Sequence, residues 1–153
     1  MEKVRLQIFN HVSRNGHIYI ADTKEDIEKI FGKFRNEKSP LWLTDQLQGP
    51  DFDRKNMSVD EYRDEFATVD IARIAGIFED IEIVETGDIG YNDKPIFEVY
   101  GYLKIINTDG GRHVGELLKE NVCSIGMRSF SAERNQKIYD IEHVVCFDLI
   151  SGE

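Results

Sequence analysis

The sequence contains few cysteines, few prolines and no long hydrophobic run. Two cysteines and three prolines occur in 153 residues. Two cysteines cannot build the multi-disulfide framework of a small secreted domain, so we expect free thiols in a reducing compartment. No apolar run approaches the roughly 20 residues of a membrane helix. The first ten residues, MEKVRLQIFN, lack the apolar core of a signal peptide. We therefore expect neither a membrane partner nor secretion.

Basic residues are also scarce, at 19 against 29 acidic residues, which gives a net charge of −10. Grooves that follow a phosphate backbone need the opposite sign, so the sequence predicts no direct nucleic-acid partner. No pair of cysteines or histidines has metal-ligand spacing, and we expect neither a metal nor a cofactor. An acidic surface suits docking onto a basic protein.

The length and composition are those of an ordinary soluble domain. Apolar residues make up 41% of the chain and charged residues 31%, as in typical globular proteins. A chain of this length can bury a substantial core without disulfides or metals. We therefore predict a single domain over residues 1–153.

The N-terminal half predicts two strands and two helices. Apolar residues alternate over residues 3–9 and again over 17–20, as in half-buried strands. Thr23 can cap a helix over residues 24–36, which has apolar residues at helical spacing. After the short apolar run Leu41-Trp42-Leu43, a polar loop is expected as far as Met57. Ser58 and Glu61 form a capping-box pattern that predicts a short helix to about Phe66.

The C-terminal half is richer in strand patterns. Asp109-Gly110-Gly111 reads as a turn before a short helix. The expected elements are strands over 68–85 and 95–107 joined by an acidic turn at 85–93, a helix over 112–120, a strand over 122–130, a loop over 132–137 and a strand over 138–150. The chain as a whole predicts about six strands and three short helices, which is an α+β domain with a mostly antiparallel, barrel-like sheet.

The order of these motifs is distinctive. The segment GRHVGELLKEN (111–121) precedes Ser124-Ile125-Gly126-Met127-Arg128, and a closing strand carries FDLIS (147–151). The order resembles that of the prohead serine proteases of tailed bacteriophages, which share a fold with herpesvirus assembly proteases. RNGHIY (14–19) and PLWLTD (40–45) are similar to N-terminal motifs of the same family. The resemblance implies the prohead-protease fold over nearly the whole chain.

The resemblance also implies two site residues. Ser124 matches the nucleophile, and Arg128 matches the residue that helps to hold the oxyanion, where a fixed positive donor stabilises developing negative charge. A second register of the motif places the nucleophile at Gly126 or Met127, where this chain has no serine. From the residues alone, Ser124 also suits a serine packed within a strand, and Arg128 a surface or ion-paired arginine.

The base that a serine nucleophile requires is not evident. The family's histidine belongs to the segment aligned with 41–45, where this chain has Thr44 and Asp45. Threonine cannot act as a base, and aspartate is a weak one unless burial raises its pKa. His143, on the strand after Ser124, is a candidate base, and His17 is another. The apolar neighbours of His143 equally fit a core or interface histidine.

The resemblance, together with the missing histidine, implies a phage head-assembly protein that is catalytically weak or inactive. Such a protein would be a core or inner-capsid component, associated with capsid, scaffold or core proteins and with itself, in the virion or in the host cytoplasm during assembly. Its last residues, Ser151-Gly152-Glu153, resemble a site cut by such proteases after glutamate. One alternative is an active serine endopeptidase that cleaves head precursors after glutamate. A second, outside this family, is a cytosolic α+β binding module.

Overall fold

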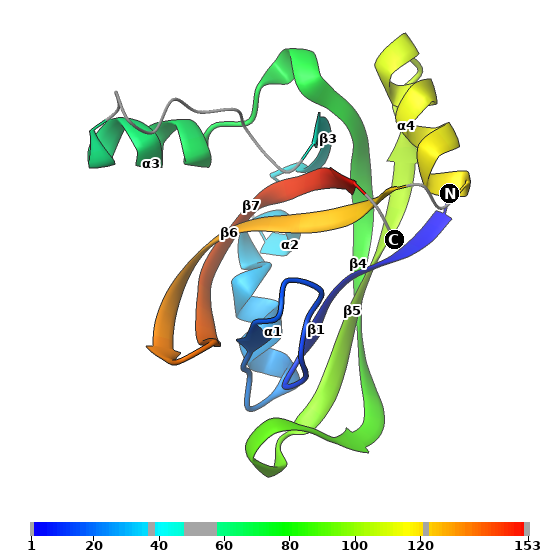
Figure 1. The fold of residues 1–153 in the computed structure, drawn as a ribbon. Coiled ribbons are helices and arrows are strands. Elements are labelled where there is room, and N and C mark those ends of the chain that lie inside the picture. The colour runs from blue at the N-terminus through cyan, green and yellow to red at the C-terminus, as the bar shows by residue number, and fades with distance from the viewer. Residues whose placement is uncertain (1, 37–38, 48–57, 121–122, 152–153) are drawn as a thin grey trace.

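The computed structural model describes residues 2–36, 39–47, 58–120 and 123–151, and these form one continuous seven-stranded sheet with helices around it (Figure 1). The strands are β1 (Glu2–Phe9), β2 (Ile18–Tyr19), β3 (Leu41–Leu47), β4 (Ile74–Ile89), β5 (Pro95–Ile105), β6 (Cys123–Asn135) and β7 (Ile138–Ser151). The helices are α1 (Lys24–Ile30), α2 (Gly32–Asn36), α3 (Val59–Ala67) and α4 (Asp109–Lys119), with 3₁₀ turns η1 (Ile71–Arg73) and η2 (Tyr91–Asp93). No helix in the described ranges is long and apolar enough to cross a membrane.

The sheet curls into a nearly closed barrel of mixed direction. Its strand order is β1-β5-β4-β3-β7-β2. β6 lies outside this order and pairs with β7. The pairs β1–β5, β5–β4, β4–β3 and β6–β7 are antiparallel, whereas β3 and β2 run parallel to β7. At the seam, the amide of Gln7 on β1 lies 3.8 Å from the sulfur of Met127 on β6. The predicted α+β, barrel-like fold is confirmed.

The core fills the inside of this barrel and the space under α1 and α4. On β5, Phe97, Val99, Gly101 and Leu103 are buried while the residues between them are not, as the alternation predicted. Gly101 is needed there because a Cβ would lie within 3 Å of Phe78 and Leu6. The largest fully buried apolar side chains come from β1, α1 and its C-cap, β3, β5, α4 and β7, and they are Phe9, Ile27, Phe31, Leu41, Leu43, Val99, Val114, Cys146 and Phe147.

The helices follow their capping residues, with two corrections to the sequence prediction. Thr23 forms a reciprocal capping box with Asp26 at the start of α1. The expected single helix over 24–36 divides at the buried Phe31 into α1 and α2, so the described chain has four α-helices. The hydroxyl of Ser58 accepts a hydrogen bond from the Glu61 N–H, as the capping-box pattern predicted for α3. Thr108 caps α4, which begins three residues earlier than expected.

Two strand boundaries also differ from the sequence prediction. β4 begins at Ile74, because Asp70 accepts a hydrogen bond from the Ala72 N–H and turns residues 71–73 into η1. The expected loop over 132–137 is mostly strand, and only a tight turn at residues 136 and 137 separates β6 from β7. The loop expected as far as Met57 falls largely outside the described residues, although β3 continues to Leu47.

Bulges in the β6–β7 pair change which face His143 occupies. Alternation along β7 predicted that His143 and Phe147 share one face. The register shifts between Arg128 and Ser129, and again between Phe130 and Ser131. One extra residue in a strand reverses the faces of all residues beyond it. Phe147 is therefore buried, while His143 is exposed.

Candidate functional site

Three neighbouring strands bring together a threonine, an aspartate and an arginine. Asp148 on β7 pairs in register with Thr44 on β3 and with Gly126 on β6. The Thr44 hydroxyl donates to Asp148 Oδ1 at 2.5 Å. The Arg128 guanidinium donates to both carboxylate oxygens, from Nε at 2.8 Å and from Nη2 at 2.6 Å. Thr44, Arg128 and Asp148 are 0%, 3% and 4% exposed, so this is a buried ionic network.

The network also reaches α3. Nη1 of Arg128 donates to the carbonyl oxygens of Phe66 at 3.3 Å and Thr68 at 3.0 Å. These carbonyls lie at the C-terminal end of α3, where helix carbonyls have no partner within the helix. Burial would lower the pKa of Arg128, but its hydrogen bonds to Asp148 raise that pKa above the usual value. The arginine is therefore a permanently charged clamp between the barrel and α3.

Ser124 lies on the same strand and face as Arg128. It is two residues before Gly126 on β6 and pairs with Ile150, with no register shift between Ser124 and Arg128. Alternation places Ser124 diagonally across from Asp148, an arrangement that typically separates residues by about 7–8 Å. Its hydroxyl oxygen is buried and has no hydrogen-bond partner among the described residues. The structure thus places Ser124, Arg128 and Asp148 on one face of the sheet.

The two candidate bases, His143 and His17, lie away from Ser124. His143 pairs with Phe130, which lies six residues after Ser124 on β6. Six residues of a strand span roughly 20 Å, so His143 is far from Ser124. The exposed His143 ring lies against Phe130, with ring centroids 4.9 Å apart. His17 stacks on Tyr139 near the start of β7, with centroids 4.3 Å apart. The structure therefore does not bring His143 or His17 to Ser124.

The segment aligned with the family's histidine contributes no base. Thr44 uses its hydroxyl as a donor to Asp148. The carboxylate of Asp45 lies 2.8 Å from Arg73 Nε, so this side chain forms an ion pair with an arginine outside the network. A serine hydroxyl without a base is a poor nucleophile. The described side chains form a buried ionic network on the same sheet face as a serine hydroxyl that has no hydrogen-bond partner among them.

Cys146 lies beside the carboxylate of Asp148, and its environment makes the thiol unreactive. Its Sγ is 3.7 Å from Asp148 Oδ1. Burial and the negative charge of Asp148 raise the pKa of the thiol to about 12. Since the thiolate is the reactive form, the thiol is not a nucleophile at neutral pH. No group of three acidic, histidine or cysteine side chains in the described ranges is placed to hold a metal ion.

This state of Cys146 can be tested in a Cys123→Ser background. We expect no labelling of the folded protein by iodoacetamide at pH 8 and rapid labelling once it is unfolded in urea. The folded-state pKa is raised, so stability should be full below about pH 9 and decline as the pH rises towards 12. A Cys146→Ala variant should lose less stability between pH 9 and 10. Rapid labelling of the folded protein would contradict the buried environment.

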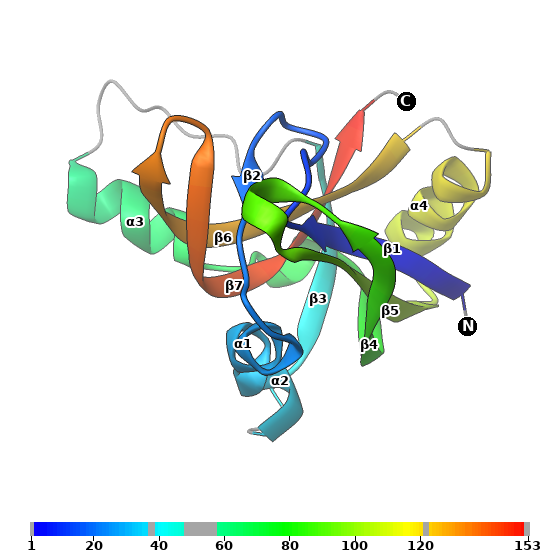
Figure 2. The same ribbon diagram turned by 90° about the horizontal axis from the view of Figure 1, so that it is seen from below.

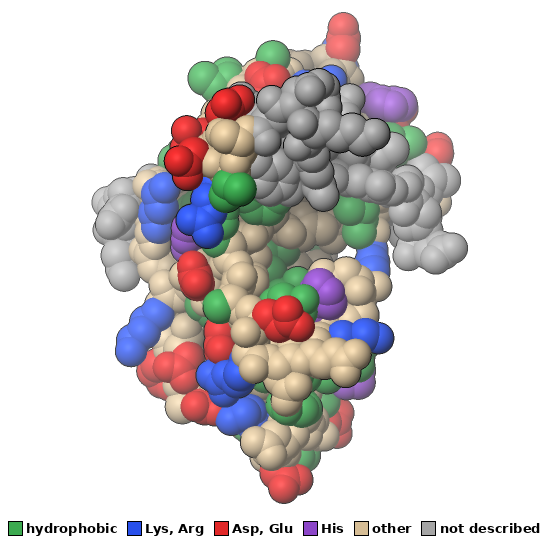
Figure 3. All heavy atoms as spheres, turned by 60° about the vertical axis from the view of Figure 1, so that its left-hand side comes forward, with side chains coloured by type: hydrophobic (Ala, Val, Ile, Leu, Met, Phe, Trp, Pro, Cys, Tyr) green, Lys and Arg blue, Asp and Glu red, His purple; other side chains and the backbone are tan. Residues whose placement is uncertain are grey.

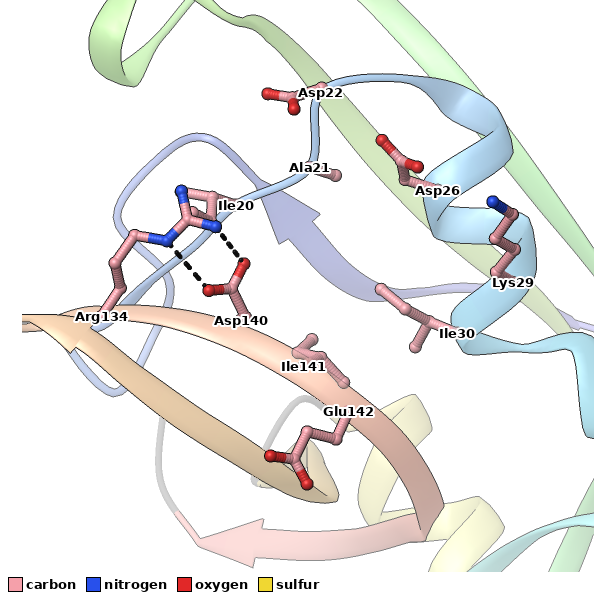
Figure 4. A pocket seen from close by; sticks show the side chains of 10 residues that line it. All are labelled: Ile20, Ala21, Asp22, Asp26, Lys29, Ile30, Arg134, Asp140, Ile141 and Glu142. Carbon is pink, nitrogen blue, oxygen red and sulfur yellow. Dashed lines mark hydrogen bonds and ion pairs between the residues drawn. The ribbon is translucent and has the colours of Figure 1, made fainter.

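A cavity of about 280 Å³ lies away from Ser124, between α1 and the β6–β7 hairpin (Figure 4). Its polar side chains are largely engaged with one another or with nearby residues. Arg134 donates to both oxygens of Asp140 at 3.0 Å, as the dashed lines in Figure 4 show. Asp26 belongs to the α1 capping box, and Asp22 forms an ion pair with Lys94. The cavity therefore presents no nucleophile beside a free base.

Sequence reasoning singled out Ser124 and Arg128 but not the partner that orients the arginine. A signal for Asp148 was available, because it is the only charged residue in the apolar run VVCFDLI (144–150). Charged residues are almost never fully buried unless they are paired. The contribution of Thr44 could be recognised only once β3 was known to pair with β7.

No family model matches the chain, and no curated protein matches it significantly by sequence. Among solved structures it is similar to the bacteriophage T4 capsid assembly protease, gp21, at 15% identity and a TM-score of 0.55. The similarity covers 99% of this chain and 81% of the T4 chain. The chain thus has the fold of a phage capsid assembly protease. The likeness inferred from the sequence motifs is supported at the level of fold.

Proposed function

We propose that residues 1–153 form one prohead-protease-like domain that serves as a non-catalytic head-assembly protein of a tailed bacteriophage. It would belong to the core or inner capsid of the prohead, and to the host cytoplasm while heads assemble. Its partners would be capsid, scaffold or core proteins and further copies of itself. Glu153, which the sequence pattern likens to a cleavage site, lies outside the described residues.

One observation carries the proposal of inactivity. Where the family resemblance expects a histidine, Thr44 donates a short hydrogen bond to the buried Asp148. None of the candidate bases, His143 or His17, lies at Ser124. Arg128, proposed from sequence as an oxyanion donor, directs its guanidinium to Asp148 and to the end of α3. These contacts support a role in which the fold is retained without His143 or His17 acting as a base for Ser124.

The alternative is an active serine endopeptidase of capsid maturation. It is favoured by the Ser124 hydroxyl, which is buried without a partner and shares a face with Arg128 and Asp148. A buried hydroxyl without a hydrogen bond is costly and is sometimes retained for chemistry. This alternative requires a base other than His143 and His17.

A cleavage assay separates the two. Purified protein is incubated with a capsid or core precursor that carries Ser-x-Glu sites, beside a Ser124→Ala control, and products are read by intact mass. A known phage protease that cuts the same precursor shows that the substrate is competent. We expect no cleavage by either form. Cleavage that Ser124→Ala abolishes would overturn the proposal in favour of the endopeptidase.

Ser124→Ala should leave the fold and head assembly intact. Removing a buried, unpartnered hydroxyl is expected to change the free energy of unfolding by less than about 1 kcal/mol. Ser131→Ala is a matched control in the same strand, where the hydroxyl has a partner, Ser129, at 3.1 Å. Urea denaturation and counts of infectious particles measure the two effects. Loss of particles with a normally folded Ser124→Ala protein would count against a non-catalytic role.

A further inference from the structure

The segment from Ser58 to Arg73, which contains α3 and η1, is exposed almost throughout. Among its described side chains, only Phe66 and Val69 are partly buried. Val59 and Ile71, at 74% and 84% exposed, are the most exposed large hydrophobic residues in the described chain. Figures 1 and 2 show α3 standing apart from the barrel, on the side away from α4. The segment displays apolar side chains that the fold itself does not cover.

The anchors of this segment gather at its C-terminal end. Arg128 binds the carbonyls of Phe66 and Thr68. The Phe66 ring packs edge-on against Phe130, with centroids 5.1 Å apart. Arg73 pairs with Asp45 beyond the helix. Among the described side chains, these anchors lie from Phe66 onward, and the described residues of the first two turns of α3 are exposed.

Helix physics makes such a projection unusual. A helix of nine residues is marginal in water unless tertiary packing stabilises it. A helix that is exposed on nearly all sides gains little from its own packing. Here the arginine clamp fixes the end of α3 and so determines the direction in which the rest extends. This arrangement suits a helix that completes its packing on another molecule.

The charge of α3 indicates the chemistry of that molecule. Asp60, Glu61 and Asp64 are exposed around a single Arg63 in the projecting turns. Figure 3, which brings the α3 side forward, shows carboxylates on the upper part of the face, where α3 lies, and others over its lower part. A complementary surface is basic, with an apolar site for Val59. A second copy is disfavoured, because the chain carries a net charge of −10.

We propose that residues 58–73 form a docking segment for another head protein, through a basic surface patch with an apolar centre on that partner. The proposal rests on the proposed function, which supplies the class of partner. Val59 and Ile71 would enter the apolar centre, and the carboxylates of Asp60 and Asp64 would face the basic rim. Arg128 acts as a positioning residue that aims the segment.

Site-specific photo-crosslinking in cells that assemble proheads tests the docking segment. The photoreactive residue p-benzoylphenylalanine is placed at position 59 and, as a matched control, at position 89, since Ile89 is 65% exposed on a distant hairpin. Purified proheads are irradiated, and crosslinked peptides are identified by mass spectrometry. We expect position 59 to crosslink to a lysine- or arginine-rich segment of a capsid, scaffold or core protein, at least ten-fold more than position 89.

Charge reversal provides a second readout. Asp60→Lys with Asp64→Lys should reduce the crosslink from position 59 at least ten-fold. The matched pair Glu85→Lys with Asp88→Lys, also exposed, should leave it unchanged. Circular dichroism and urea denaturation check that each variant folds like the parent.

Three outcomes would overturn the docking segment while the protein is present in proheads. These are no crosslink from position 59, a crosslink only to another copy of this chain, or a crosslink that charge reversal leaves intact. Absence of the parent protein from proheads would instead overturn the proposed function on which the docking segment rests. The composition of the proheads therefore distinguishes the two failures.

Discussion

Arg128→Met should lower the free energy of unfolding by about 3–5 kcal/mol, as expected when one partner of a buried ion pair is removed. Methionine retains much of the arginine stem but none of its donors. Among the described residues, Asp148 would then keep a buried charge with the Thr44 hydroxyl and the weakly donating Cys146 thiol as its side-chain partners. The end of α3 would lose its two guanidinium hydrogen bonds. Urea denaturation measures the loss, and hydrogen exchange should show faster exchange across α3.

An exposed arginine–aspartate pair serves as the control that separates the effect of burial from the effect of charge. Arg134 makes the same two-point contact with Asp140, but these side chains are 59% and 42% exposed. Arg134→Met should therefore cost at most about 1 kcal/mol. Adding Asp148→Leu to Arg128→Met should recover a large part of the loss, because the unpaired buried charge is removed. A cost for Arg128→Met no larger than that for Arg134→Met would show that the network does not stabilise the fold.

Asn10→Ala is expected to have a comparable effect, about 3–5 kcal/mol, from several unsatisfied groups and backbone strain. The Asn10 side chain is fully buried. Its amide donates to the carbonyls of Ala21 and Pro95 at 2.8 and 2.6 Å, and its oxygen accepts from the Ala21 N–H at 3.1 Å. Its φ of +66° lies in the left-handed region, which alanine disfavours. One side chain thus ties the end of β1 to the α1 connection and to the β4–β5 hairpin.

Asn92 is the control for the backbone contribution. It also has a positive φ, of +53°, but it is exposed on the hairpin turn. Asn92→Ala should cost only about 1 kcal/mol, from the left-handed conformation alone. Thermal unfolding of both variants measures the difference. Equal losses for the two substitutions would mean that the buried hydrogen bonds of Asn10 contribute little.

Local sequence patterns predicted much of the fold. The cap at Thr23, the capping box at Ser58 and the alternation along β5 each depend on residues close together in the chain, so their structures follow from sequence. The boundaries that were wrong depend on contacts between distant residues or on a single competing side chain. Phe31 divides α1 from α2 where it enters the core, and Asp70 delays the start of β4.

The candidate site shows the same division. Ser124 and Arg128 could be selected from a short motif, and the threonine at position 44 already indicated a missing histidine. That Thr44, Arg128 and Asp148 form one buried network could not be predicted, because β3, β6 and β7 meet only through the strand order of the barrel. The separation of His143 from Ser124 likewise depends on the pairing register of β6 and β7. The exposure of His143 depends on bulges that a periodic sequence pattern does not reveal.

The sequence by itself determined the class of fold, the positions of most strands and helices, the excess of acidic residues and the presence of Thr44 where the family resemblance expects a histidine. Those properties are local or compositional, so the order of residues is enough to decide them. Only the tertiary structure decided that Asp148 binds Arg128, that Arg128 clamps α3, and that α3 projects with Val59 exposed. These depend on which strands become neighbours, and that choice is made by burial and hydrogen bonding across the whole barrel rather than within any segment.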